Sequence, residues 1–135
     1  MSQVGQSTRR RPLTQWVAII LLLGLSVSGF NDAADNVRSL LTTGQKVATA
    51  VQFGHSLMGL IAIGALLARS RWTQLVLWTW AALISLTAGL ASVVWGGSGP
   101  VVGLVAGSAS AAIAGLVVWM ALRGTETRRG GERKR

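Results

Sequence analysis

The sequence has no cysteine and no tyrosine, and only two of its 135 residues are proline. Without cysteine the chain can form no disulfide bond, no thiolate metal site and no thiol redox centre. Charge is also scarce, because Asp, Glu, Lys and Arg make up 13% of the residues, against about 25% in typical soluble domains. The composition therefore excludes thiol chemistry and disfavours an ordinary water-soluble domain.

Long apolar stretches stand where a soluble domain would carry charge. Hydrophobic residues make up 50% of the chain, and they concentrate in four stretches, at approximately 13–30, 47–68, 72–95 and 101–122. A helix rises about 1.5 Å per residue, so about 20 apolar residues cross a hydrocarbon core about 30 Å thick. We therefore expect an all-α integral membrane protein with four transmembrane helices.

The positive residues are distributed very unevenly between the two sides of these spans. Only Arg38 and Lys46 fall on one side, together with Asp32 and Asp35. Because cytoplasmic loops of membrane proteins carry the excess of lysine and arginine, we expect both termini in the cytoplasm. The net charge of +9 then reflects membrane topology, and we expect no nucleic-acid partner. The eleven positive residues on the cytoplasmic side are Arg9, Arg10, Arg11, Arg69, Arg71, Arg123, Arg128, Arg129, Arg133, Lys134 and Arg135.

Two short connections predict how the helices are arranged. The second and third spans are joined around Arg69–Arg71, and the third and fourth around Gly96–Pro100, a run of turn-forming residues. Short turns place consecutive helices antiparallel and side by side, so we expect an up-down four-helix bundle. The preference for arginine over lysine, with many alanines and glycines, favours a bacterial source. We therefore expect a multi-pass protein of the bacterial cytoplasmic (inner) membrane.

Four of the six tryptophans lie near the ends of the predicted spans. Trp16, Trp72 and Trp119 lie near cytoplasmic ends and Trp95 near an outer end, as in the aromatic belts of membrane proteins. The other two lie deeper in the third span, where lipid contact or helix packing is the simplest interpretation and a ligand is the alternative.

The segment 31–46 is the only sizeable connection between predicted spans. Asn31 and Asp32 are suited to start a helix, and the apolar residues that follow recur at helical spacings. We expect a short amphipathic segment on the outer membrane surface, broken at Gly44. An extension of the second helix out of the bilayer is the alternative.

The two chain ends, 1–12 and 123–135, are basic and lack apolar periodicity, and we expect both to be disordered. Residues 1–29 also permit a different interpretation. Their basic start, their apolar run and the small residues 26–29 are typical of a cleaved secretory signal. Cleavage would leave three helices, and we favour four because the apolar run can remain as a membrane span.

Small residues form a regular series on each of the last two spans. Lipid tails are as apolar as leucine, so helices in a bilayer associate through close backbone approach at small residues. We expect these faces to pack closely, against each other or against another subunit, which predicts a homo-oligomer or a larger membrane-protein partner. The residues are Ala82, Ser85, Gly89 and Ser92 on the third span, and Gly103, Gly107, Ala111 and Gly115 on the fourth.

The second span is the most polar. Gln45, Thr49, Gln52 and Ser56 recur at spacings of four, three and four, and His55 lies beside them. Polar groups at membrane depth are costly unless they are satisfied, so this face should turn toward the bundle interior, a partner or water. Hydrogen bonding between helices is the simpler interpretation, and a ligand or transport path is the functional one.

Little in the spans can do chemistry, because His55 is their only titratable residue. Acid–base or nucleophilic catalysis needs a second reacting group, and a metal site needs three or four donors. One imidazole also cannot supply both axial ligands of a membrane haem. We therefore expect no enzyme activity, no cofactor and no metal site.

The leading hypothesis is a small non-enzymatic accessory or structural subunit that packs through its small-residue helix faces. The first alternative is a small oligomeric transporter or channel with a polar path on the second span. The second alternative is a haem- or quinone-associated membrane anchor.

Overall fold

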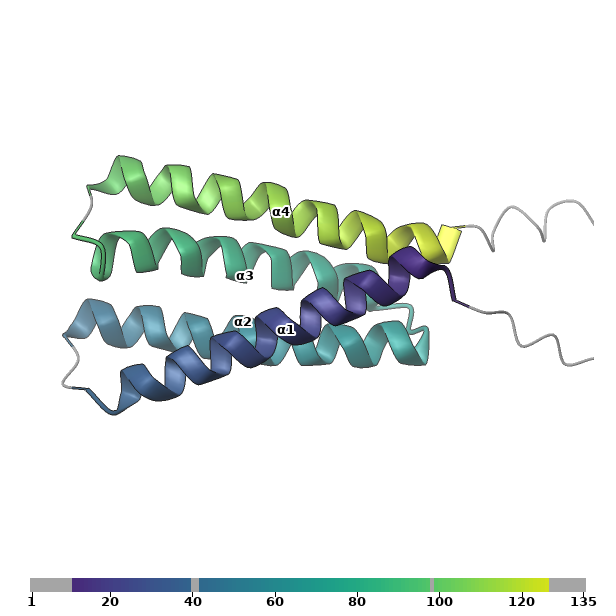
Figure 1. Cartoon of the computed structure of the whole chain (residues 1–135), viewed down its shortest axis with the longest axis horizontal. Coiled ribbons are helices and arrows are strands. Elements are labelled where there is room, and N and C mark those ends of the chain that lie inside the picture. Colours follow the sequence, from purple (N-terminus) through teal and green to yellow (C-terminus); the bar gives the residue numbers. More distant parts are fainter. Residues whose placement is uncertain (1–10, 40–41, 98, 127–135) are drawn as a thin grey trace, which may run out of the picture.

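The structure is a computed structural model that describes residues 11–39, 42–97 and 99–126. In these ranges the chain forms four α-helices, all of them long and apolar enough to cross a membrane. This confirms the predicted all-α class and the multi-pass membrane character. The helices are α1 (Leu13–Val37), α2 (Thr43–Ala68), α3 (Thr73–Val94) and α4 (Pro100–Glu126), shown in Figure 1.

The helices lie along one long axis, and each packs against the next in the sequence. α1 also packs against α4, which it approaches where α1 begins and α4 ends. We call this the terminal end of the bundle; the α2–α3 connection lies there too (Figure 1, right). The α1–α2 and α3–α4 connections lie at the opposite end.

The connection between α1 and α2 differs from the prediction. Residues 31–37 continue α1, so they form no separate amphipathic segment, and Asn31 and Asp32 lie inside a helix instead of starting one. The physical reason is that the buried face of α1 runs on beyond the apolar stretch: Gly29 and Ala33 are both buried. A continued helix also keeps the backbone hydrogen-bonded where the chain leaves the membrane.

Gly44 does not break a helix, because it lies in the first turn of α2. Thr42 caps this helix: its Oγ1 accepts the Gln45 backbone N–H at 3.4 Å, and Gln45 Oε1 accepts the Thr42 N–H at 2.9 Å. This reciprocal capping box satisfies two donors that a helix start would otherwise leave free. The alternative, a second helix extended by several turns, is therefore also wrong, since α2 begins at Thr43.

At the other end of the chain α4 continues to Glu126, so residues 123–126 belong to a helix and not to a disordered tail. The remaining parts of the two predicted disordered ends, 1–10 and 127–135, lie outside the described residues.

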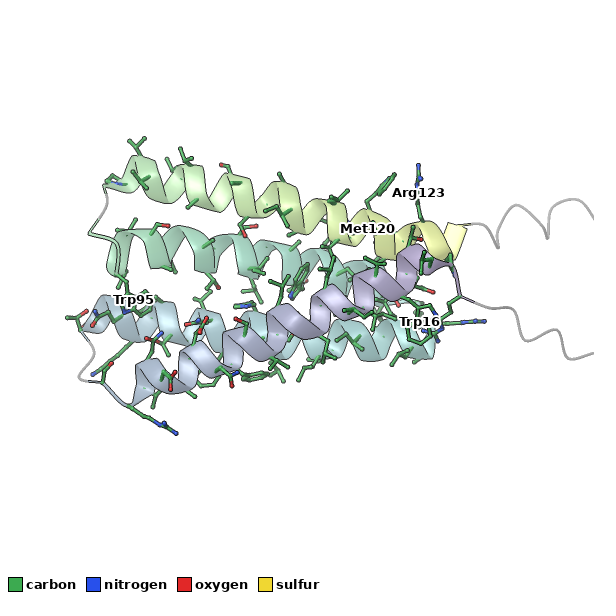
Figure 2. The ribbon with its side chains drawn as sticks, in the orientation of Figure 1. Trp16, Trp95, Met120 and Arg123 are labelled. Atoms are coloured by element: carbon green, nitrogen blue, oxygen red, sulfur yellow. The ribbon has the colours of Figure 1, made fainter. Side chains whose placement is uncertain are left out.

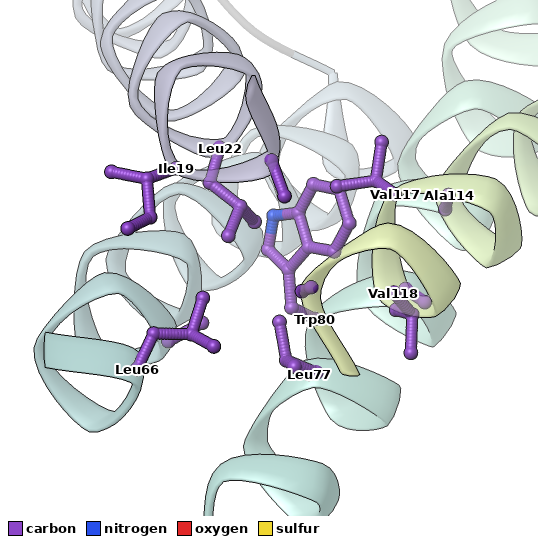
Figure 3. Packing of buried hydrophobic residues seen from close by; sticks show 12 residues of the cluster. Ile19, Leu22, Leu66, Leu77, Trp80, Ala114, Val117 and Val118 are labelled. Carbon is purple, nitrogen blue, oxygen red and sulfur yellow. The ribbon is translucent and has the colours of Figure 1, made fainter. Parts of the chain in front are cut away.

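The main hydrophobic core lies in the half of the bundle nearer the terminal end. Trp80 is fully buried at its centre, with Leu22, Leu66 and Val118 from the three other helices around it (Figure 3). Helix packing, one of the simple interpretations of a deep tryptophan, is thus what the structure shows for Trp80. The buried members are Ala18, Ile19, Leu22, Ala62, Leu66, Leu77, Trp80, Ala81, Ala114, Val117, Val118 and Ala121.

Candidate functional site

The polar face of α2 lies mostly inside the bundle, between α1 and α3. Thr49, His55 and Ser56 are buried, and Gln52 is half-buried. Gln45, at the start of the helix, is also half-buried and uses its side chain to cap the first turn. The structure therefore brings four of the five predicted residues into one interior region. The fifth, Gln45, caps the start of its own helix.

His55 is held by α3. Its Nδ1 lies 3.2 Å from Thr87 Oγ1, and that hydroxyl donates to the Leu83 carbonyl oxygen at 2.9 Å. The direction of the Thr87–His55 hydrogen bond follows the imidazole tautomer: Nδ1 donates when it carries the ring proton and accepts when Nε2 carries it. The other ring nitrogen is Nε2. It faces α1, where a Cβ on Gly29 would lie 2.8 Å away.

Gln52 connects the cluster to α1. Asn36 Nδ2 donates to Gln52 Oε1 at 3.3 Å, and Ser56 Oγ donates to the Gln52 backbone oxygen at 2.9 Å. Asn36 belongs to the segment 31–46, which the sequence predicts to be an outer connection. The sequence pattern does not indicate Thr87 as a site residue. The signal for Asn36 was the continuing register of α1, in which positions 29, 33 and 36 follow one helical face.

α1 and α2 approach closely through a reciprocal pair of serines and glycines. Ser26 and Gly29 on α1 have the same spacing as Ser56 and Gly59 on α2. A Cβ on Gly29 would meet Ser56 Oγ, and a Cβ on Gly59 would meet Ser26 Oγ. We call these four residues the serine–glycine crossing. The repeated Ser-x-x-Gly spacing is the sequence signal for this crossing, and of its four residues only Ser56 belongs to the predicted polar face.

Three polar atoms in this region are buried and have no hydrogen-bond partner among the described residues: Ser26 Oγ, Thr49 Oγ1 and Trp80 Nε1. Ser26 Oγ and Trp80 Nε1 both lie against Gly59, where a Cβ would be 3.1 Å from the indole nitrogen. Bulk water cannot reach such atoms in a bilayer, so each carries a desolvation cost. The cluster is therefore closely packed but incompletely satisfied.

The polar region does not continue through the bundle. From Gly59 toward the terminal end, the interior is filled by the hydrophobic core around Trp80, Leu66 and Leu77. Within the described part of the chain there is also no group of three or more His, Cys, Asp or Glu that could hold a metal ion. The residues present can exchange hydrogen bonds with a small polar molecule, but they form no continuous path.

The two small-residue series meet over only part of their length. A Cβ on Gly103 would lie 3.0 Å from the Gly89 carbonyl oxygen, and a Cβ on Gly107 would lie 3.2 Å from that of Ser85. Ala82 and Ala111 are exposed, and a Cβ on Gly115 would meet nothing within 4 Å.

Ser92, the last member of the α3 series, is half-buried and donates to the Ala88 carbonyl oxygen at 2.9 Å. The two series therefore pack α3 against α4 near the opposite end of the bundle. The remaining small residues of the α4 series, Ala111 and Gly115, are left uncovered.

Four apolar helices around a small buried polar cluster define a multi-pass membrane protein. No protein-family model, curated protein or solved structure matches this chain.

Proposed function

We propose that this protein is a small non-enzymatic subunit of the bacterial inner membrane. It packs through small-residue helix faces against a larger membrane protein or against further copies of itself. The observation that carries the proposal is the unused part of the α4 series: Ala111 is exposed and Gly115 is open, although Gly103 and Gly107 are covered. Ser108 and Ala112 extend this exposed surface. In a bilayer such a surface favours close approach of another helix.

The proposed orientation is an up-down bundle with both termini in the cytoplasm. It is supported by the positive residues: Arg11, Arg69, Arg71 and Arg123 adjoin helix ends at the terminal end of the bundle, and Arg38 and Lys46 adjoin those at the opposite end. The other seven positive residues stand before Arg11 or after Glu126 in the sequence. The exposed indoles of Trp16 and Trp95, labelled at the two ends in Figure 2, fit an aromatic belt at each membrane surface.

The non-enzymatic part of the proposal is supported by how the interior hydroxyls are used. Ser56 and Thr87 both donate to carbonyl oxygens of their own helices, so neither is aligned for activation by His55. A nucleophile needs its proton directed at a base, and here the Thr87 hydroxyl donates to the Leu83 carbonyl oxygen instead.

Substitutions on the open part of α4 test the subunit role. We expect the pair Ala111→Leu and Ala112→Leu to release the partner or dissociate the oligomer, because two leucines keep another backbone away. Ile113→Leu is the matched control, since Ile113 is exposed on α4 but on another side of the helix from Ser108, Ala112 and Gly115. Crosslinking in native membranes gives the readout. If both variants crosslink as strongly as the wild type, the exposed part of α4 is not the contact surface.

A transporter or channel is the second candidate, and the arrangement of Gln52 and His55 is the observation that favours it. These two side chains bring polar partners from α1 and α3 into the bundle, from the opposite end as far as the serine–glycine crossing. Passage further would require the core around Trp80 to move. Flux that disappears in Gln52→Leu and His55→Leu while assembly is retained supports transport. Assembly that disappears with them supports the subunit.

A haem-associated role is less well supported by the geometry. Nδ1 of His55 faces Thr87, and Nε2 faces the α1 backbone at Gly29, so neither nitrogen has space for an iron ligand bond. A visible absorption spectrum of the protein purified from native membranes tests this role, because a bound haem gives a strong Soret band.

A further inference from the structure

Three arginines at the terminal end lie over tryptophan rings. The guanidinium carbon of Arg123 is 3.8 Å from the ring centroid of Trp119, that of Arg71 is 5.3 Å from Trp72, and that of Arg11 is 5.9 Å from Trp16. We call these the arginine–tryptophan pairs. They come from the end of α4, from the α2–α3 connection and from the start of α1, so they are spread around one end of the bundle. Figure 2 shows Trp16 and Arg123 at this end.

The tryptophans of these pairs are available to the membrane surface. Trp16, Trp72 and Trp119 are 47%, 56% and 48% exposed, in contrast to the fully buried Trp80. Tryptophan prefers the headgroup level of a bilayer, where its ring is in apolar surroundings and its edge is hydrated. Rings at that level would place the three guanidinium groups close to the lipid phosphates.

Positive charge at this end has no carboxylate partner among the described side chains. Among the described residues, the salt bridge is between Arg38 and Asp35, at 3.9 Å, and it lies at the opposite end of the bundle. Arg69 adds a fourth guanidinium at the terminal end. The sequence places seven more basic residues and two glutamates in the adjoining chain ends, so the excess remains strongly positive.

Arg11 shows how one of these groups is positioned. Its Nη2 donates to the Leu67 carbonyl oxygen at 2.9 Å, in the last turn of α2, where a helix has unpaired carbonyls and favours a cation. Its other amino nitrogen, Nη1, is buried and has no hydrogen-bond partner among the described residues. The guanidinium is thus fixed by one nitrogen while the other lacks an acceptor.

We propose that the arginine–tryptophan pairs bind anionic phospholipids. Each phosphate accepts hydrogen bonds from a planar guanidinium, whose fork matches phosphate oxygens, while the indole beneath it contacts the glycerol and upper acyl chain. The occupant is a lipid headgroup because the tryptophans hold the site at the membrane surface and the charge is complementary. Two of the three pairs, Arg11–Trp16 and Arg71–Trp72, lie outside α4, so the proposal does not depend on the subunit role.

Lipid titration of the full chain in detergent tests the proposal, with native mass spectrometry counting bound phosphatidylglycerol and phosphatidylcholine. We expect the wild type to prefer phosphatidylglycerol. Arg71→Gln with Arg123→Gln should weaken that binding by about tenfold or more, from the loss of two surface charges near phosphate. Arg123→Lys should bind less tightly than the wild type, because it keeps the charge but loses the planar fork.

Two single substitutions provide matched controls. Arg69→Gln removes the same charge at the same end from an arginine outside the three pairs, and Arg38→Gln removes it at the opposite end. Arg38→Gln should retain near wild-type affinity, and Arg69→Gln should weaken binding less than Arg71→Gln or Arg123→Gln alone, because it removes charge without disrupting a pair. Circular dichroism should show all variants folded. Equal binding of the two lipids, or an Arg69→Gln effect as large as that of either single substitution in a pair, would overturn the proposal. Inorganic phosphate that displaces the lipid at a concentration equal to that of the lipid would show a phosphate site without lipid specificity. That result also contradicts the proposal.

Discussion

Glycine at position 59 lets α1 and α2 approach closely, because a methyl group there would overlap Ser26 Oγ. Ser26 is fully buried, so it cannot move aside into solvent. We expect Gly59→Ala to lower the free energy of unfolding by about 1–3 kcal/mol, the usual cost of overpacking. Thermal unfolding in detergent, followed by circular dichroism, measures it.

Gly64→Ala is the control on the same helix, because a Cβ at Gly64 would meet nothing within 4 Å. There we expect no loss and a gain of up to about 1 kcal/mol, from the better helix propensity of alanine. Equal effects at positions 59 and 64 would mean that the serine–glycine crossing does not limit the approach of the two helices.

The Ser26 hydroxyl is buried and has no hydrogen-bond partner in the part of the chain that the structure describes. We expect Ser26→Ala to leave stability unchanged or to raise it by about 1 kcal/mol, because a desolvated polar group is removed. It should also reduce the cost of Gly59→Ala, since the atom that would clash is gone. The double variant measures this coupling. A marked loss of stability in Ser26→Ala alone would show that the hydroxyl has a partner.

Arg69 is the one non-glycine residue with positive φ among those described, at φ 53°, and it follows the last residue of α2. A left-handed backbone is unfavourable for a residue with a Cβ, and glycine is the usual choice at this position. We expect Arg69→Gly to raise stability by up to about 1 kcal/mol and Arg69→Val to lower it. An unchanged melting temperature in both variants would contradict this. Arginine suits this position if the benefit of its positive charge exceeds the cost of its left-handed backbone.

At the scale of helices, hydropathy predicted the four elements well, because twenty apolar residues in a bilayer have no other way to satisfy their backbone. The helix ends were predicted less well. Asn31 and Asp32 were interpreted as the start of a helix, yet α1 continues through them because its buried face extends to Ala33. The Thr42–Gln45 capping box was present in the sequence and marks the true start of α2.

The candidate site could be predicted on one helix and not across helices. The spacing on α2 indicated that Thr49, His55 and Ser56 share an inward face, and they are buried. Their partners on other helices could not be derived, because periodicity within one helix does not fix its rotation against a neighbour. For the same reason, nothing in the α4 series indicated that Gly103 would be covered and Gly115 left open.

At the scale of the whole molecule, the absence of cysteine makes membrane topology directly measurable. Ser39 and Ser70 lie at the two ends of the bundle, in the α1–α2 and α2–α3 connections. With an impermeant maleimide on intact cells, we expect Ser39→Cys to react and Ser70→Cys to react only after the membrane is opened. The reverse pattern would invert the proposed orientation, and labelling of both would show mixed insertion.

The whole molecule also limits what it can do alone. The hydrophobic core around Trp80 separates its polar cluster on α2 from the terminal end, and its small-residue surface on α4 faces outward. Both features favour a protein that acts through contact with another membrane protein or with its own copies.

Contact with a larger membrane protein or with further copies is tested by purifying the tagged full chain from its native membrane in a mild detergent. Mass spectrometry and particle mass then identify what accompanies it. We expect a larger membrane protein in fixed ratio, or a discrete oligomer of this chain. A homogeneous, folded monomer without any partner would contradict it.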